Sequence, residues 1–149
     1  MRDFFKGFVY AARGFCAAVK AERNLRFHLT VAVFVVYFGR FYAFGRGEWA
    51  AIALAIGGVI GLELVNSALE RAVDKPAPER FYMAGQVKDM AAAGVLAYSV
   101  GAAAAGLCLF WQPDVIRQVF LYFTEAAYRP VLLLAALALA WRFVFRNNK

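Results

Sequence analysis

Four polar side chains that could do chemistry interrupt or close a long apolar stretch, and they are Glu63, Asn66, Glu70 and Asp74. A helix turns once in 3.6 residues, so their spacing places all four on one helix face. An acid near the middle of a membrane helix costs on the order of 3 kcal/mol on insertion scales, and such acids seldom persist without a partner. The structural alternative is a protonated Glu63 that is hydrogen-bonded inside a helix bundle. The clustering favours a working acidic site instead.

Two other segments carry matching polar residues directly before apolar runs. The first is AERNLRFH, with Glu22, Asn24 and His28, and the second is GQVKDMAAAGVL, with Lys88 and Asp89. Carboxylate oxygens suit Mg²⁺, which binds proteins through one or two carboxylates together with waters and phosphate oxygens. A lysine beside such a site would neutralise phosphate charge. Phosphoryl transfer needs little beyond a metal, a positioned cation and a base.

The motifs of soluble kinases and of zinc sites are missing from this sequence. It has no GxxxxGK[ST], no kinase Gly-rich loop and no DFG, which excludes a soluble-kinase origin. No His/Cys cluster has the spacing of a zinc site. We interpret the lone His28 as a hydrogen-bonded interfacial residue, with metal ligation as the alternative. We expect no nucleic-acid partner.

The composition indicates membrane residence. Of the 149 residues 63% are hydrophobic, including 15 Phe, which is more than the core of a soluble domain can hide. A helix that crosses the bilayer needs about 20 mostly apolar residues. The predicted fold is therefore all-α and integral to the membrane: a surface helix, three transmembrane helices and an additional C-terminal fourth. The predicted elements are the amphipathic surface helix 3–20, spans over about 27–44, 49–69 and 90–111, and a fourth span over 130–145.

Residues 3–20 are too charged and too short to cross the bilayer. Lys6, Arg13 and Lys20 recur every seven positions and form one basic stripe beside aromatic and aliphatic residues. This pattern predicts an interfacial helix with its stripe toward anionic headgroups. A simple basic anchor is the alternative.

The basic residues also predict the topology. With the N-terminus inside, 13 Lys and Arg fall on the cytoplasmic side and 4 on the other side. The positive-inside rule then places both termini and the loop 71–89 in the cytoplasm. Cys16 and Cys108 would lie near opposite faces of the membrane. We therefore expect no disulfide between them and expect both to be packing residues.

Three sequence blocks resemble one known family. ELVNSALERAVD resembles the signature E-[LI]-x-N-[ST]-A-[LI]-E-x-x-x-D of the prokaryotic diacylglycerol kinase and undecaprenol kinase family. KDMAAAGVL is similar to its K-D-x-x-[AS]-[AG]-A-V-L block. ERNLRFH is similar to the form in undecaprenol kinases of the Gram-positive type, whereas diacylglycerol kinases of the better-studied type share only its Glu and Arg. The blocks occur in the family's order, and the resemblance covers roughly residues 4–111.

The resemblance implies a small integral-membrane lipid kinase of the bacterial inner membrane. Such a kinase uses Mg²⁺ and takes ATP as co-substrate, with its active site in the cytoplasm. It would work as a homotrimer with shared active sites. Residues 1–111 would form the kinase domain and residues 112–149 a C-terminal extension. This extension goes beyond the family's usual third span. A fourth helix there would cover the trimer's outer surface or gate lateral lipid entry, and packing without a further role is the alternative.

The resemblance also implies roles for individual residues. Glu63 would be the catalytic base and Asn66 would help hold the reacting groups, while Glu22 and Glu70 would bind the metal. The nucleotide-binding set would be Tyr10, Glu22, Glu70, Glu79, Arg80, Phe81, Lys88 and Asp89. The candidates for binding the lipid substrate are Asn24, Arg26 and His28.

The expected acceptor is undecaprenol, because Asn24 and His28 accompany Glu22 in the first block. The product would be undecaprenyl phosphate. Diacylglycerol, which would give phosphatidic acid, is the alternative acceptor. An alternative from another class is a noncatalytic helical membrane assembly or an ion-conducting protein that uses its intramembrane acids.

Overall fold

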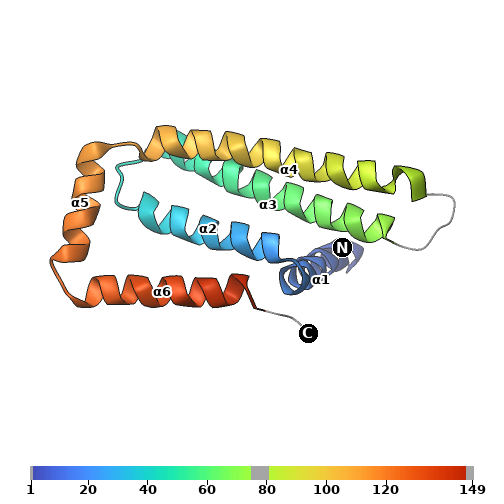
Figure 1. Ribbon diagram of the computed structural model, residues 1–149, viewed down its shortest axis with the longest axis horizontal. Helices are drawn as coiled ribbons and strands as arrows, with labels where there is room; N and C mark the ends of the chain where they lie inside the picture. The colour runs from blue at the N-terminus through green and yellow to red at the C-terminus, as the bar shows by residue number, and fades with distance from the viewer. Residues whose placement is uncertain (1, 75–80, 147–149) are drawn as a thin grey trace.

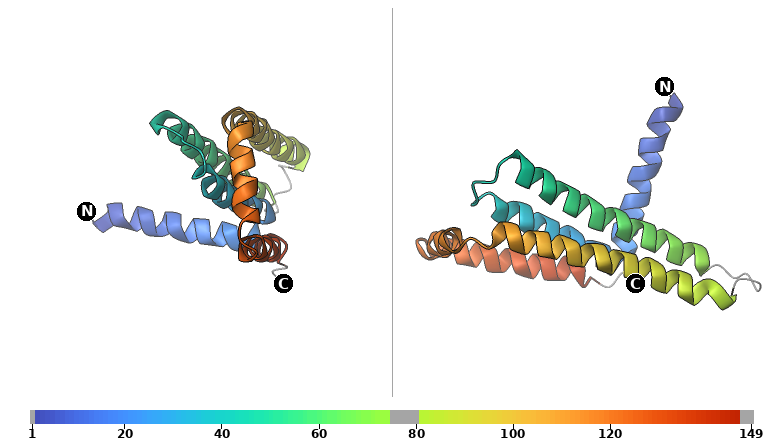
Figure 2. Two further views of the ribbon diagram at one scale, coloured as in Figure 1. Left: turned by 90° about the vertical axis from the view of Figure 1, so that its left-hand side faces the viewer. Right: turned by 90° about the horizontal axis from the view of Figure 1, so that it is seen from above.

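The computed structural model describes residues 2–74 and 81–146, and over these residues the chain is helical with short connections. The helices in chain order are α1 (Arg2–Ala21), α2 (Arg23–Gly39), α3 (Arg46–Val73), α4 (Phe81–Phe110), α5 (Pro113–Thr124) and α6 (Tyr128–Val144). Figure 1 shows α2, α3, α4 and α6 running along one common direction. α5 lies across one end of this bundle, and α1 projects sideways beside the start of α2, with α3 and α4 running on beyond that point (Figure 2).

The helices confirm an all-α membrane protein. Within residues 2–74 and 81–146, α3 and the Met83–Phe110 part of α4 are long and apolar enough to cross a membrane. α5 and α6 pass the same test only as a pair, bent by 101°. α2 and α6 have 17 residues each, which gives a length of about 25 Å. The number of spans therefore stays a prediction.

The ends of α2 and α4 differ from the ends that the apolar pattern predicts. α4 begins at Phe81, well before the predicted span 90–111, because the helix continues through the turn that holds Gln86, Lys88 and Asp89. α2 ends at Gly39 rather than near residue 44. Its last turn is closed by backbone bonds from Phe41 N to Phe38 O (3.0 Å) and from Tyr42 N to Gly39 O (3.1 Å), and such tight bonds commonly end a helix.

α3 and α4 pack closely through a small residue. A Cβ atom added at Gly58 would lie 2.1 Å from the Tyr98 hydroxyl oxygen, whereas one added at Gly57 would meet nothing within 4 Å. The Tyr98 hydroxyl donates a hydrogen bond to the Leu54 carbonyl oxygen at 3.0 Å. Gly58 therefore leaves the space that the Tyr98 ring occupies. Small residues at helix contacts are typical of membrane bundles.

Few apolar side chains are buried between the helices. The buried ones in the described part of the chain are Ala18, Leu25, Ile52, Val95 and Val144. Most other large apolar side chains are exposed, as expected where lipid surrounds the helices. Cys16 on α1 and Cys108 on α4 are also exposed, and neither forms a disulfide. The expectation that both cysteines pack is therefore wrong, because both side chains point out of the bundle.

Candidate functional site

The polar face of α3 lies at the end of the bundle where α1 meets α2. Glu63 is 3% exposed and Asn66 is 7% exposed. Glu70, one turn farther along, is half-buried, and Asp74 is the exposed C-cap of the helix. The face thus passes from buried to exposed side chains along its length. This gradient suits a site that accepts a water-soluble partner at one end and meets the bilayer at the other.

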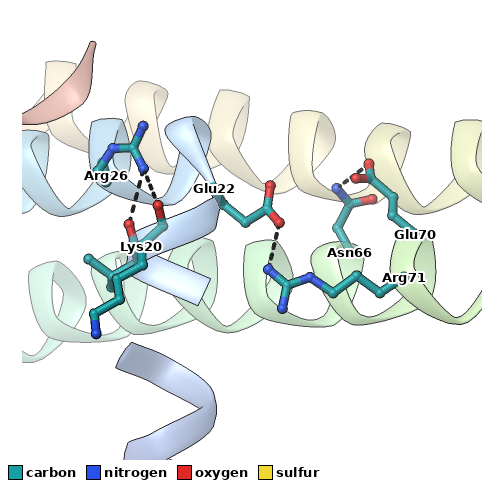
Figure 3. Close-up of polar contacts among 7 residues, drawn as sticks. Lys20, Glu22, Arg26, Asn66, Glu70 and Arg71 are labelled. Carbon is teal, nitrogen blue, oxygen red and sulfur yellow. Dashed lines mark hydrogen bonds and ion pairs between the residues drawn. The ribbon is translucent and has the colours of Figure 1, made fainter. Parts of the chain in front are cut away.

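Asn66 connects two of these residues and leaves one acceptor free. Its Nδ2 donates a hydrogen bond to Glu70 Oε1 at 3.1 Å (Figure 3). Its Oδ1 is buried and has no hydrogen-bond partner among the described residues. A buried acceptor without a partner costs about 1–3 kcal/mol. The Asn66 Oδ1 atom is therefore available to a donor or a cation from outside the chain.

The ERNLRFH block reaches the same face. The Asn24 side chain lies within hydrogen-bonding reach of the Glu63 carboxyl, and Glu70 and Glu22 lie near enough to interact electrostatically with it. Glu22 stands at the break between α1 and α2, as the N-cap of α2. The fold therefore brings together three predicted acids from two separate parts of the chain.

Glu22 has a partner that the sequence patterns did not indicate. Arg71 Nη2 donates to Glu22 Oε1 at 2.9 Å, which joins α3 to the α1–α2 break (Figure 3). Arg71 occupies a variable position of the ELVNSALERAVD block, so no motif marked it. Only the fold, which brings residues 49 positions apart into contact, reveals the pair.

Lys88 lies at the water-facing end of the site. Its Nζ donates to Asp74 Oδ1, which links α4 to the end of α3. The neighbouring Asp89 is exposed. The cation predicted for phosphate binding is therefore held at the same end of the bundle as the acids of α3.

The other predicted residues lie in different surroundings. Tyr10 on α1 is 64% exposed, whereas Arg26 is 4% exposed and bonded to backbone carbonyls. His28 is half-buried and lines a cavity between α2, α3 and α4. Glu79 and Arg80 lie outside the described residues. Phe81 is described only as the first residue of α4.

The donors at this site fit a magnesium ion that is shared with a ligand. Within residues 2–74 and 81–146, no three His, Cys, Asp or Glu side chains come together to hold a metal ion. Mg²⁺ does not need such a group, since it binds through one or two carboxylates and completes its shell with waters and phosphates. Glu22, Glu70 and the unpartnered Oδ1 of Asn66 supply hard oxygens of this kind.

Comparison with known proteins identifies the family. The model of the prokaryotic diacylglycerol kinase family matches residues 9–110. An undecaprenol kinase of Bacillus subtilis is 38% identical over 110 residues, which cover 74% of this chain and 89% of the relative. Diacylglycerol kinases of Synechocystis sp. and Helicobacter pylori are 33% and 32% identical, over 71% and 64% of this chain and 61% and 74% of their own lengths. No solved structure matches the chain.

The matched residues run from within α1 to the end of α4 and leave α5 and α6 outside the match. Of the three relatives, the undecaprenol kinase has the highest identity. All three are named as lipid kinases, which sets aside a noncatalytic helical assembly or an ion channel. This chain belongs to the prokaryotic diacylglycerol kinase family and is a lipid kinase of a bacterial membrane.

Proposed function

We propose that this kinase transfers the γ-phosphoryl group of Mg-ATP to the hydroxyl of undecaprenol and forms undecaprenyl phosphate. The observation that carries the proposal is a buried carboxyl, Glu63, beside Asn24 and two further acids at one end of an apolar helix. The acceptor is supported by the ERNLRFH block and by 38% identity to an undecaprenol kinase.

Glu63 would act as the general base. It would take the proton of the lipid hydroxyl while the hydroxyl oxygen attacks the γ-phosphorus and ADP leaves with the β–γ bridging oxygen, a role worth about 10²–10⁴ in rate. Asn24 would orient the Glu63 carboxyl, as its position within hydrogen-bonding reach suggests. Because the lipid hydroxyl stays at the membrane surface, the base must be carried by a helix that enters the bilayer. α3 meets this requirement.

Glu22, Glu70 and Asn66 would hold the magnesium ion, and Lys88 and Asp89 would contact the nucleotide. When bound, Mg²⁺ would neutralise charge on the phosphates of ATP. Glu22 would have to exchange its Arg71 partner for the ion. Both side chains of this pair are partly exposed, and exposed ion pairs are worth only about 0–1 kcal/mol. The exchange therefore costs little.

A groove beside Glu63 suits the hydrocarbon chain of the lipid acceptor. A cavity of about 680 Å³ between α2, α3 and α4 is lined mostly by apolar side chains. One end reaches His28 and Ile60, each about one turn from Asn24 and Glu63, and the other reaches Trp111. Its volume lies within the 300–1,000 Å³ that is usual for ligand sites. We propose that this cavity holds the first isoprene units of the acceptor.

We also propose that the kinase works as a homotrimer with shared active sites.

Diacylglycerol is the second candidate acceptor, because two of the three relatives are diacylglycerol kinases. The purified full-length protein should be given γ-labelled Mg-ATP with equal mole fractions of undecaprenol and diacylglycerol. We expect label in undecaprenyl phosphate at a clearly higher rate than in phosphatidic acid. Equal or reversed rates would contradict the proposed acceptor.

The same assay tests the proposed base. Glu63→Gln should lower phosphoryl transfer by about 10²–10⁴. Glu48→Gln is the matched control, since Glu48 is an exposed acid in the first turn of the same helix, at the opposite end. Full activity of Glu63→Gln would remove Glu63 from the mechanism and leave the acceptor assignment to the lipid comparison.

A further inference from the structure

Arg26 is a buried cation that joins three helices. It lies in the first turn of α2 and is 4% exposed. Its Nε and Nη2 donate to the Val144 carbonyl oxygen at 3.2 and 3.1 Å, and Nη2 also donates to that of Arg146 at 3.3 Å. Its Nη1 donates to the carbonyl oxygens of Val19 at 3.2 Å and Lys20 at 3.0 Å (Figure 3). These bonds account for all five N–H donors of a guanidinium group.

All of these acceptors belong to the C-terminal ends of two helices. Val19 and Lys20 lie in the last turn of α1, and Val144 and Arg146 lie at the end of α6 and just after it. The last four carbonyl groups of a helix have no partners within the helix, and they carry the negative end of its dipole. One cation placed between two such ends satisfies both. Arg26 therefore fastens α6 to α1 through the start of α2.

This contact lies next to a proposed metal ligand. Glu22 is the residue at the bend between α1 and α2, four positions before Arg26. Backbone bonds tie it in both directions: Glu22 N donates to Ala18 O at 2.7 Å, and Arg26 N donates to Glu22 O at 3.3 Å. The direction of the bend sets where the Glu22 carboxylate points. A group that holds the last turn of α1 against α2 therefore also holds Glu22.

The α6 side of the contact comes from outside the region that matches the family. That region ends at residue 110, whereas Val144 and Arg146 supply three of the five bonds to Arg26. A second tie lies beside it, since the Arg23 guanidinium lies 5.9 Å from the centre of the Phe145 ring. The C-terminal extension thus reaches the bend that carries Glu22.

We propose that α6 is a positioning element of the kinase site, which acts through Arg26 to fix the α1–α2 bend and the Glu22 carboxylate. The inference rests on the proposed role of Glu22 as a metal ligand. Arg26 is a positioning residue, because the N–H groups of its guanidinium all bond to backbone carbonyl oxygens. It acts on the site only through Glu22. Val144 makes the proposal testable from the α6 side, since this residue is only 5% exposed.

The bend can be measured in the full-length protein through its two native cysteines. Cys16 on α1 and Cys108 on α4 are exposed and free for spin labels. We expect a narrow distribution of label-to-label distances in the parent protein, diluted with unlabelled chains. Arg26→Lys cannot reach both helix ends, and Val144→Lys places a charge in the packed end of α6, so both should broaden the distribution. Arg142→Gln, an exposed cation in the same turn of α6, should leave it unchanged.

Kinetics then test the link to Glu22. We expect Arg26→Lys and Val144→Lys to raise the magnesium concentration for half-maximal rate by about tenfold, as is usual when support for a metal ligand is lost. The KM for the lipid should not change. An unaltered distance distribution or magnesium dependence in Val144→Lys would overturn the proposal. An unaltered magnesium dependence in Glu22→Gln would instead contradict the proposed function of Glu22.

Discussion

Glu63 and its neighbours explain why an acid persists in an apolar helix. Glu63 is 3% exposed, and a buried carboxyl needs polar partners close by. Asn24 comes from α2, while Asn66 and Glu70 follow on the next two turns of α3. The polar cluster therefore has partners inside the protein and still leaves one oxygen, Asn66 Oδ1, for a ligand. A residue kept only for packing would not need these polar neighbours.

The Glu22–Arg71 pair should compete with the metal. Arg71→Gln frees Glu22, so we expect the magnesium concentration for half-maximal rate to fall by up to about fivefold, the equivalent of an exposed ion pair of 1 kcal/mol or less. Initial rates against magnesium at saturating ATP measure this. Arg13→Gln, which removes an exposed cation from α1, is the control for net charge. A rise in the magnesium requirement of Arg71→Gln would contradict this view of the pair.

Residue patterns predicted only what lies within one helix. The face from Glu63 to Asp74 follows from the helical repeat, because no other element is needed to place those side chains together. The contact of Arg26 with Val144 joins residues 118 positions apart, and no pattern in the sequence marks it. Arg26 was predicted to bind substrate, yet its five donors hold helix ends.

At the scale of helices, Gly58 sets the approach of α3 to α4. Gly58→Ala would drive a methyl group into the Tyr98 ring, and overpacking of this kind costs about 1–3 kcal/mol. Thermal unfolding of the purified protein, followed by circular dichroism, should show a lowered midpoint. The matched control is Gly57→Ala, where the added methyl group meets nothing within 4 Å. Equal midpoints for the two variants would show that this contact does not limit stability.

Hydropathy predicted the existence of the helices better than their ends. The apolar windows located α3 and α4, because the membrane selects apolar residues there. They missed the helical turns at 70–73 and 81–89, which carry charged residues and continue both helices beyond the predicted spans. The window for the first span ran past Gly39 into a turn that is also rich in apolar residues. Hydropathy reports the surroundings of a segment, whereas backbone hydrogen bonds decide where its helix stops.

At the scale of the whole molecule, the fold predicts which parts share a side of the membrane. α1 and the end of α6 meet at Arg26, and α5 crosses the opposite end of the bundle (Figure 1). In spheroplasts, with both native cysteines replaced by Ala, an impermeant maleimide should label Gln118→Cys on α5. It should label Arg13→Cys on α1 only after permeabilisation. The reverse pattern would overturn the predicted topology.

The shortness of α2 and α6 has a consequence for the surrounding bilayer. Both helices are predicted spans of 17 residues, which are about 25 Å long, a few ångströms less than a typical hydrocarbon layer. Membranes commonly thin around spans of this length. In the thinned bilayer around α2 and α6, the polar ends of the lipids would lie closer to the bilayer centre. This would bring them toward the depth of Glu63. Turnover should therefore be faster in vesicles of short-chain than of long-chain phosphatidylcholine. The enzyme would then thin the bilayer around itself and bring the hydroxyl of the acceptor within reach of Glu63.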